Sequence, residues 1–183
     1  MSVLRGFVNT INVVNDWVGD KLAYFLFGFF VLILLQVMLR YVFNAPTVWA
    51  SELAQMLFGA YVVLSGGHIL RVGGHVNVDI IYSRLSSRGK ALIDICTSVL
   101  FFLFCGLLLV YGGSMAWDSV MQLETSGSAW DVPVYPLKLT IPLAALLLIF
   151  QGLAKLIVDI CTVLGVEIEL REPEKVTSKE ESL

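Results

Sequence analysis

Four long stretches with almost no charge dominate this chain of 183 residues. They run from Leu22 to Leu39, Leu53 to Leu70, Ile95 to Trp117 and Leu139 to Val158. Each is about as long as the roughly 20 helical residues that cross the hydrocarbon core of a bilayer. Only 15% of the residues are charged, against about 25% in an ordinary soluble domain. Most soluble classes are therefore excluded, because a single soluble core cannot cover four such runs.

These runs are expected to form helices. Backbone polar groups in lipid must bond to one another, which leaves helices or a closed barrel. Barrel strands alternate in polarity over about ten residues, and residues 25–35 show no alternation. We therefore predict an all-α integral membrane protein with four transmembrane helices, over about 22–40, 50–71, 92–117 and 137–160.

Basic residues predict the orientation of the chain, because Lys and Arg favour cytoplasmic loops. Four crossings with a cytoplasmic N-terminus place the C-terminus in the cytoplasm as well. Ten of the twelve basic residues then lie inside, and only Arg40 and Lys138 lie outside. The ten are Arg5, Lys21, Arg71, Arg84, Arg88, Lys90, Lys155, Arg171, Lys175 and Lys179. We predict that both termini are cytoplasmic.

Two segments outside the spans have the apolar spacing of amphipathic helices. In residues 1–21 the apolar positions are Val3, Phe7, Ile11, Val14, Trp17 and Val18, and in the inner loop they are Val78, Ile81, Tyr82 and Leu85. Both are predicted to lie at the inner membrane surface. The inner loop would place four polar side chains near lipid headgroups: His75, Asp79, Arg84 and Arg88. Residues 161–183 are predicted to form a polar cytoplasmic tail.

No cofactor or metal site is expected. His68 and His75 lie on or just beyond one helix, whereas haem ligation by two histidines in a bundle usually draws on facing helices. No Asp or Glu accompanies them at the helical spacing of a metal site. The cysteines at 96, 105 and 161 form no CxxC pair, which argues against a thiol oxidoreductase.

The spans also lack an ionisable residue at depth. An ion-coupled carrier normally keeps an ionisable residue there. At depth the first span has only the neutral polar residue Gln36, and the fourth has only Gln151. Glu52 is expected at the outer start of the second helix, in its first turn. The chain therefore looks like a packing partner of another membrane protein and unlike a complete transport pathway.

Small residues on the second helix suggest a surface for close helix packing. Gly59, Gly66 and Gly73 recur every seven residues, so they return to nearly the same face. The stripe fits packing within the chain and packing against a partner subunit equally well. Before this helix, Asn44 and Pro46 predict a turn, Thr47 or Ser51 is a candidate helix cap, and Arg40 is a candidate ion-pair partner for Glu52.

An ordered set of residues resembles the small membrane subunit of tripartite ATP-independent periplasmic (TRAP) transporters, the DctQ-like family. The resemblance covers about residues 20–160, and residues 64–68 depart from the family's pattern. The set comprises Arg40-Tyr41-Val42-Phe43-Asn44, Pro46, Trp49, Glu52-Leu53, Gly73-Gly74-His75-Val76, Val78-Asp79, Ser126, Pro133, Tyr135 and Ile141-Pro142.

The resemblance implies a non-enzymatic scaffold subunit in a bacterial inner membrane. Its partners would be a large elevator-type membrane subunit, a periplasmic binding protein that delivers an organic acid such as a carboxylate or sulfonate, and lipids, but no nucleic acid. The coupling ion, usually sodium, would bind to the large subunit. Residues expected at the partner interface are Arg40, Trp49, Glu52, Gly59, Gly66 and Gly73. Residues expected to dock the binding protein are Asp118, Glu124, Asp131 and Lys138.

Two other functions remain open from the sequence. A membrane-anchor subunit of a haem or quinone oxidoreductase would show bound haem or quinone. A small homo-oligomeric carrier would transport substrate without any partner.

Overall fold

The computed structural model describes residues 2–72 and 86–165 as four helices joined by short connections. The helices are α1 (Ser2–Tyr41), α2 (Val48–Arg71), α4 (Ser87–Met121) and α5 (Tyr135–Leu164). All four are long and apolar enough to cross a membrane. Within the described residues the only β-type pairing is an isolated bridge between Thr125 and Pro133. The predicted helical fold class with four candidate spans is therefore confirmed.

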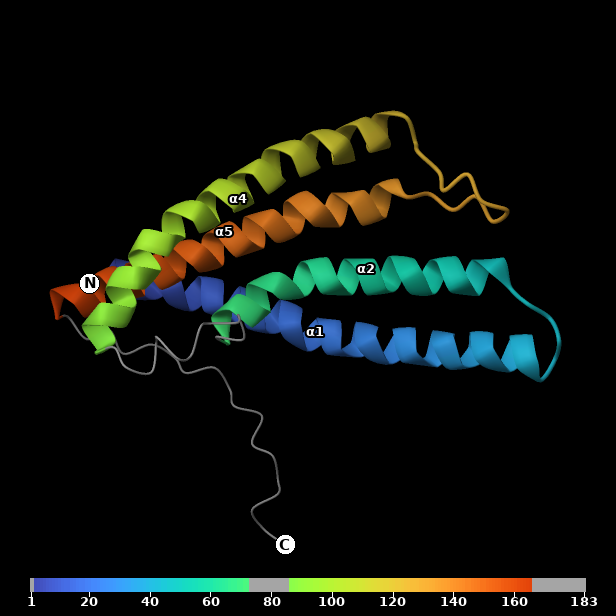
Figure 1. Ribbon diagram of the computed structural model, residues 1–183, viewed down its shortest axis with the longest axis horizontal. Coiled ribbons are helices and arrows are strands. Elements are labelled where there is room, and N and C mark those ends of the chain that lie inside the picture. The colour runs from blue at the N-terminus through green and yellow to red at the C-terminus, as the bar shows by residue number, and fades with distance from the viewer. Residues whose placement is uncertain (1, 73–85, 166–183) are drawn as a thin grey trace, which may run out of the picture.

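The helices lie side by side in a row, in the order α4, α5, α2, α1 (Figure 1). The N-terminal part of α1 crosses over to contact α5 as well. Successive helices run in opposite directions, so the connections at 42–47 and 122–134 lie at one end, here called the loop end. The N-terminus and the last residues of α5 lie at the other end, here called the terminal end.

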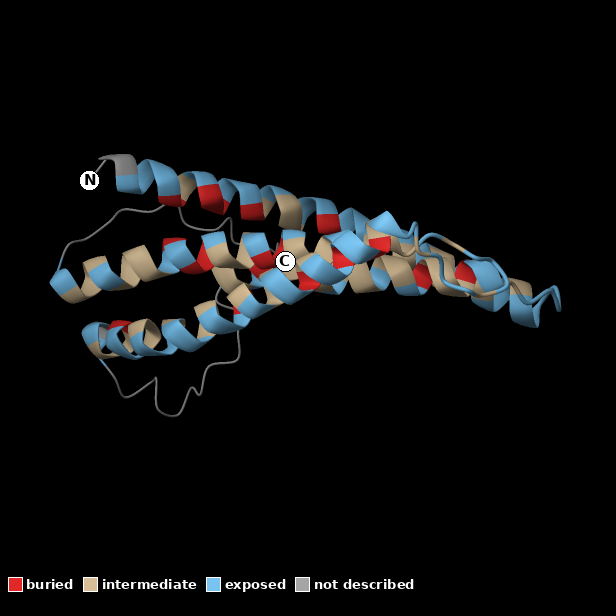
Figure 2. Ribbon diagram, turned by 90° about the horizontal axis from the view of Figure 1, so that it is seen from above, coloured by how far each residue is buried: buried red, intermediate tan, exposed pale blue. Residues whose placement is uncertain are grey.

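Helix α1 is the longest helix and has no break where the first predicted span begins. Its 40 residues correspond to about 60 Å, twice the roughly 30 Å hydrocarbon core. Val8 and Ile11 are buried against Ala154 of α5, with Ile157 and Val158 beside them. Figure 2 shows the buried residues of α1, in red, along the side of the helix that faces the other helices. Residues 2–21 of this predicted segment are thus helical and pack on α5, and the placement of the segment at the membrane surface stays a prediction.

Small side chains allow the helices to approach closely. A methyl group added at Gly67 would lie 2.4 Å from Asn15 Oδ1 of α1, and one at Gly152 would lie 2.4 Å from Phe101 of α4. Gly59 and Gly66 face Leu137 and Leu148 of α5, respectively, at ordinary contact distance. At these two positions the glycine stripe therefore packs within the chain. Gly73 lies outside the described residues.

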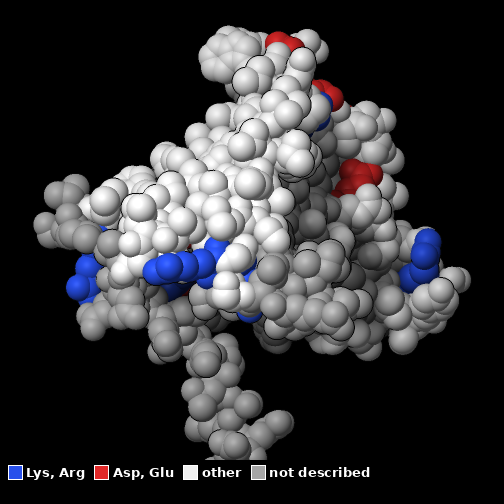
Figure 3. Space-filling view, turned by 60° about the vertical axis from the view of Figure 1, so that its left-hand side comes forward, with Lys and Arg blue, Asp and Glu red and all other residues white. Residues whose placement is uncertain are grey.

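The two helices at the edges of the row expose most of their apolar side chains. Phe27 and Phe30 of α1 and Val99, Leu103 and Phe104 of α4 are all exposed. Figure 3, which turns the terminal end toward the viewer, shows broad uncharged surface between scattered charged groups. Such faces suit contact with lipid or with other membrane helices, and they would be unfavourable in water.

The start of α2 departs from two expectations. Asn44 does turn the chain, with a φ of 50°. Thr47 occupies the N-cap position but its side chain forms no capping hydrogen bond. Ser51 bonds instead to Gln36 of α1. The expectation that Glu52 lies in the first turn is wrong, because α2 begins at Val48 and its first turn contains no acidic residue.

Candidate functional site

Glu52 of α2 holds the loop that connects α4 to α5. Its Oε2 accepts a hydrogen bond from the Ser128 hydroxyl at 2.8 Å, and Ser126 Oγ donates to the same oxygen at 3.4 Å. Ser128 Oγ also accepts the backbone N–H groups of Trp130 and Asp131, both at 3.2 Å. One carboxylate on a membrane helix therefore fixes the tip of the 122–134 loop.

A second tie fixes the base of the same loop. Glu124 forms an ion pair with Lys138 of α5. Its backbone N–H donates to the Ser119 carbonyl and its carbonyl accepts from Val134 N, both at 3.0 Å. The hydrogen bond from Lys138 holds the pKa of the Glu124 carboxyl below its usual range. The nearby Ser119 hydroxyl has a smaller effect in the same direction, although it does not reach hydrogen-bond geometry.

At the terminal end, Gln151 of α5 joins α5 to α1. Its Oε1 accepts a hydrogen bond from Asn15 Nδ2 at 2.8 Å, and its Nε2 donates to Asn12 Oδ1 at 3.1 Å. Asn15 is only 1% exposed. Polar groups buried in this way are normally paired, because an unpaired one costs roughly 1–3 kcal/mol. The three amides therefore specify how α1 crosses α5.

Arg71 extends this polar cluster to α2. Its side chain is only 4% exposed, it pairs with Asp16 of α1, and its Nη1 donates to the Asn12 carbonyl. His68 Nδ1 lies 3.8 Å from Asp16 Oδ1. The cluster thus connects α1, α2 and α5 through a buried guanidinium and three amides. The sequence alone shows polar residues at Asn12, Asn15 and Gln151. It does not show that α1 and α5 meet and bring these three side chains together.

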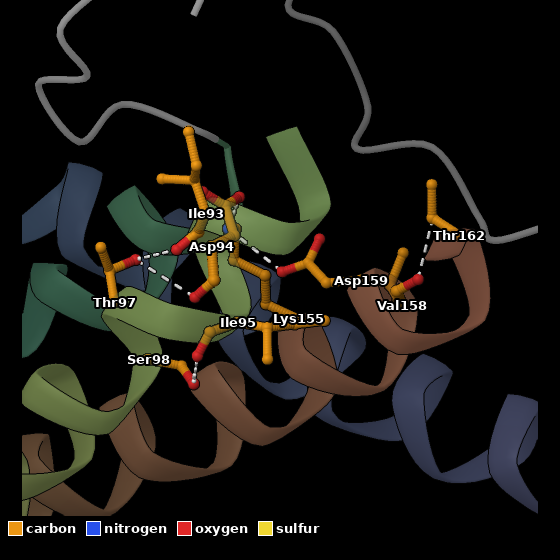
Figure 4. Close-up of polar contacts among 9 residues, drawn as sticks. All are labelled: Ile93, Asp94, Ile95, Thr97, Ser98, Lys155, Val158, Asp159 and Thr162. Carbon is orange, nitrogen blue, oxygen red and sulfur yellow. Dashed lines mark hydrogen bonds and ion pairs between the residues drawn. The ribbon is translucent and has the colours of Figure 1, made fainter. Parts of the chain in front are cut away.

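A third polar contact ties α4 to α5, again near the terminal end (Figure 4). Lys155 of α5 pairs with Asp94 of α4, and its Nζ lies 3.4 Å from Asp159 Oδ2 one turn along α5. Lys155 is exposed whereas both carboxylates are half-buried. The charged residues of the last part of α5 are therefore used for contacts between helices.

The structure brings together some of the residues singled out from the sequence. Glu124 and Lys138 pair directly, while Asp118 and Asp131 are exposed at the loop end. Arg40 is exposed at the end of α1, and within the described chain Glu52 bonds to serines and not to Arg40. Arg88 lies in the first turn of α4. The predicted roles of His75, Asp79 and Arg84 fall outside the described residues.

The geometry gives no support to a haem or quinone anchor. His68 lies beside Asp16 and Arg71, at the α1–α2 contact. Among the described residues no group of three or more His, Cys, Asp and Glu side chains could hold a metal ion.

Comparison with known proteins supplies independent information. The profile of the family "Tripartite ATP-independent periplasmic transporters, DctQ component" matches residues 29–162. The sialic acid TRAP transporter permease protein SiaT of Haemophilus influenzae (strain 86-028NP) is 25% identical over 142 residues, which are 77% of this chain and 22% of that protein. The sialic acid TRAP transporter small permease protein SiaQ of Vibrio cholerae serotype O1 (strain ATCC 39315 / El Tor Inaba N16961) is 25% identical over 135 residues, 72% of this chain and 74% of that protein.

Proposed function

The chain belongs to the DctQ component family of TRAP transporters, and we propose that it is the fixed scaffold against which a larger membrane subunit moves its substrate. As a member of that family it is the small subunit of a TRAP transporter and a multi-pass protein of the inner membrane. The chain spans only about a fifth of the first relative, SiaT, so the activity and partners of the whole transporter are part of the proposal.

The observation that carries this proposal is how the polar groups of the helices are used. Gln36 bonds to Ser51, and Gln151 bonds to Asn12 and Asn15. Asp94 and Lys155 bind each other. These amide and charged side chains thus hold one helix to the next, which suits a rigid support. An ion-coupled pathway would instead require ionisable groups that exchange partners.

The row of helices supports the same role. The two edge helices of the row, α1 and α4, present apolar side chains outward. One such face would lie against the large subunit and the others against lipid. The loop end of this row carries Arg40, Trp49 and Glu52, and we propose that these residues contribute to the partner interface.

The transport chemistry is proposed to reside in the large subunit. Both relatives are named for sialic acid, which is a carboxylate and therefore supports an organic acid as substrate. The driving force would be an ion gradient, with sodium as the coupling ion bound by the large subunit. A periplasmic binding protein would dock at the loop end, where Asp118, Glu124, Asp131 and Lys138 lie.

Reconstitution in liposomes tests this division of labour. We expect no uptake of radiolabelled sialic acid by this chain alone, and sodium-dependent uptake when the large subunit and the binding protein are added. The matched control omits only this chain. Uptake by the chain alone would contradict the scaffold role, and uptake that is equal with and without the chain would contradict it as well.

A further inference from the structure

A polar cavity of about 340 Å³ opens beside the 122–134 loop, between the loop ends of α4 and α5. Asp118, Ser119, Glu124 and Lys138 line it, with Met115 and Gln122. Two carboxylates therefore face a single ammonium group. Lys138 is already paired with Glu124, and the Asp118 carboxylate has no hydrogen bond or ion pair within residues 2–72 and 86–165. The cavity consequently carries an uncompensated negative charge.

Ser119 provides a second and independent sign of a missing ligand. It lines the cavity and is only 2% exposed. Its Oγ is buried and has no hydrogen-bond partner among the described residues. A buried hydroxyl without a partner carries a free-energy cost relative to a bonded one. A donor that reached the floor of the cavity would remove that cost and would meet the Asp118 charge at the rim.

The wall of the cavity is held in place before any ligand enters. Glu124 ties the base of the loop to α5 and Glu52 ties its tip to α2. Leu123 and Asp131 keep positive φ angles of 48° and 52°, which residues other than glycine rarely adopt. Backbone strain of this kind persists only where surrounding contacts fix the chain. A fixed surface binds a partner at lower entropic cost than a mobile one.

We infer that this cavity receives a lysine or arginine side chain from a soluble protein that docks on the loop end. A cationic head bearing several N–H donors fits both unsatisfied groups, because it can pair with Asp118 and donate to the Ser119 oxygen. The apolar stem of such a side chain would pass Met115. The inference rests on the proposed docking of a binding protein and specifies the chemistry of that contact.

A peptide titration of the full chain in lipid nanodiscs tests the inference. The probe is acetyl-Gly-Arg-Gly-amide, and its control is the same peptide with citrulline, which is neutral and nearly isosteric. Binding is followed by the backbone amide NMR signals of residues 118–124. We expect saturable shifts with the arginine peptide alone, and a dissociation constant raised about tenfold by D118N and by S119A. D20N removes an equal charge at an exposed position of α1 outside the cavity, and should bind the probe as the wild type does.

Three results would overturn the inference: no saturable shift, a loss in D20N equal to that in D118N, or equal shifts with a sodium salt at matched ionic strength. Copurification of the chain with the large membrane subunit is measured on the same variants. Its failure in the wild type would contradict the proposed function, whereas lost peptide binding with intact copurification contradicts only the cavity assignment.

Discussion

At the scale of single residues, the charged groups of the loop end divide into those that hold the loop and those that face solvent. Glu52, Glu124 and Lys138 are engaged in contacts between segments, whereas Asp118 and Asp131 are exposed. The sequence predicted that four of these five residues dock the binding protein and that Glu52 lies at the interface with the partner subunit. It could not distinguish the two groups, because the pairing depends on how a loop without regular structure folds back onto α2 and α5.

Replacing Lys138 with Gln should raise the pKa of Glu124 toward its ordinary value. Lys138 stabilises the ionised carboxylate of Glu124 in the folded chain. The contribution of this ion pair to folding stability is therefore fully present above the ordinary pKa of Glu124 and is lost as the pH falls through the lowered pKa. An NMR titration with carbon-13-labelled glutamate in nanodiscs would measure the change. Lys90→Gln, at the start of α4, is the control and should leave Glu124 unchanged. Identical titration curves for K138Q and the wild type would refute the assignment.

At the scale of helices, the four spans followed from hydrophobic length alone, while the contacts between helices did not. The apolar runs are long enough to specify helices in lipid. Which helices touch depends on a few residues that the composition does not single out. Gly67 admits Asn15, Gly152 admits Phe101, and Gln151 meets Asn12 across 139 positions of sequence. The heptad of glycines left open what packs against it, and two of its members, Gly59 and Gly66, face α5.

Substituting Gly67 with Ala should destabilise the contact between α1 and α2. The new methyl group would lie 2.4 Å from Asn15 Oδ1, and overpacking of this kind typically costs about 1–3 kcal/mol. The control is Gly28→Ala, because no atom lies within 4 Å of a methyl group at that position of α1. Thermal unfolding of both variants in detergent should show a lower Tm for G67A only. Equal Tm values would mean that α1 and α2 approach less closely than described.

At the scale of the whole molecule, the arrangement places both connections at one end and the N-terminus and the end of α5 at the other. The positive-inside rule predicts the orientation of this arrangement in the membrane. That orientation follows from the distribution of basic residues and requires no contact between helices. The order of the helices in the row, in contrast, could not have been predicted, because four apolar runs with short connections are equally compatible with a closed four-helix bundle.

Cysteine labelling should show the loop end outside the cell. The native cysteines at 96, 105 and 161 are first replaced by serine or alanine, and one new cysteine is then introduced at an exposed position. A membrane-impermeant maleimide should label A129C in intact spheroplasts and L4C only after permeabilisation. Labelling of L4C but not of A129C in intact spheroplasts would reverse the predicted orientation. Labelling of both variants in intact spheroplasts would contradict the prediction that the N-terminus lies inside.

The central position of α5 bears on how the chain is made. Its side chains bind Asn12 and Asn15 of α1, Asp94 of α4 and Glu124 of the loop, and they cover two glycines of α2. Because α5 follows the other three helices in the sequence, it is also the last to leave the ribosome. The α5 partners of Asn12, Asn15 and Asp94 are therefore absent while α1, α2 and α4 enter the bilayer. Nearly all contacts that hold α4 to the other helices can therefore form only after α5 has entered the bilayer.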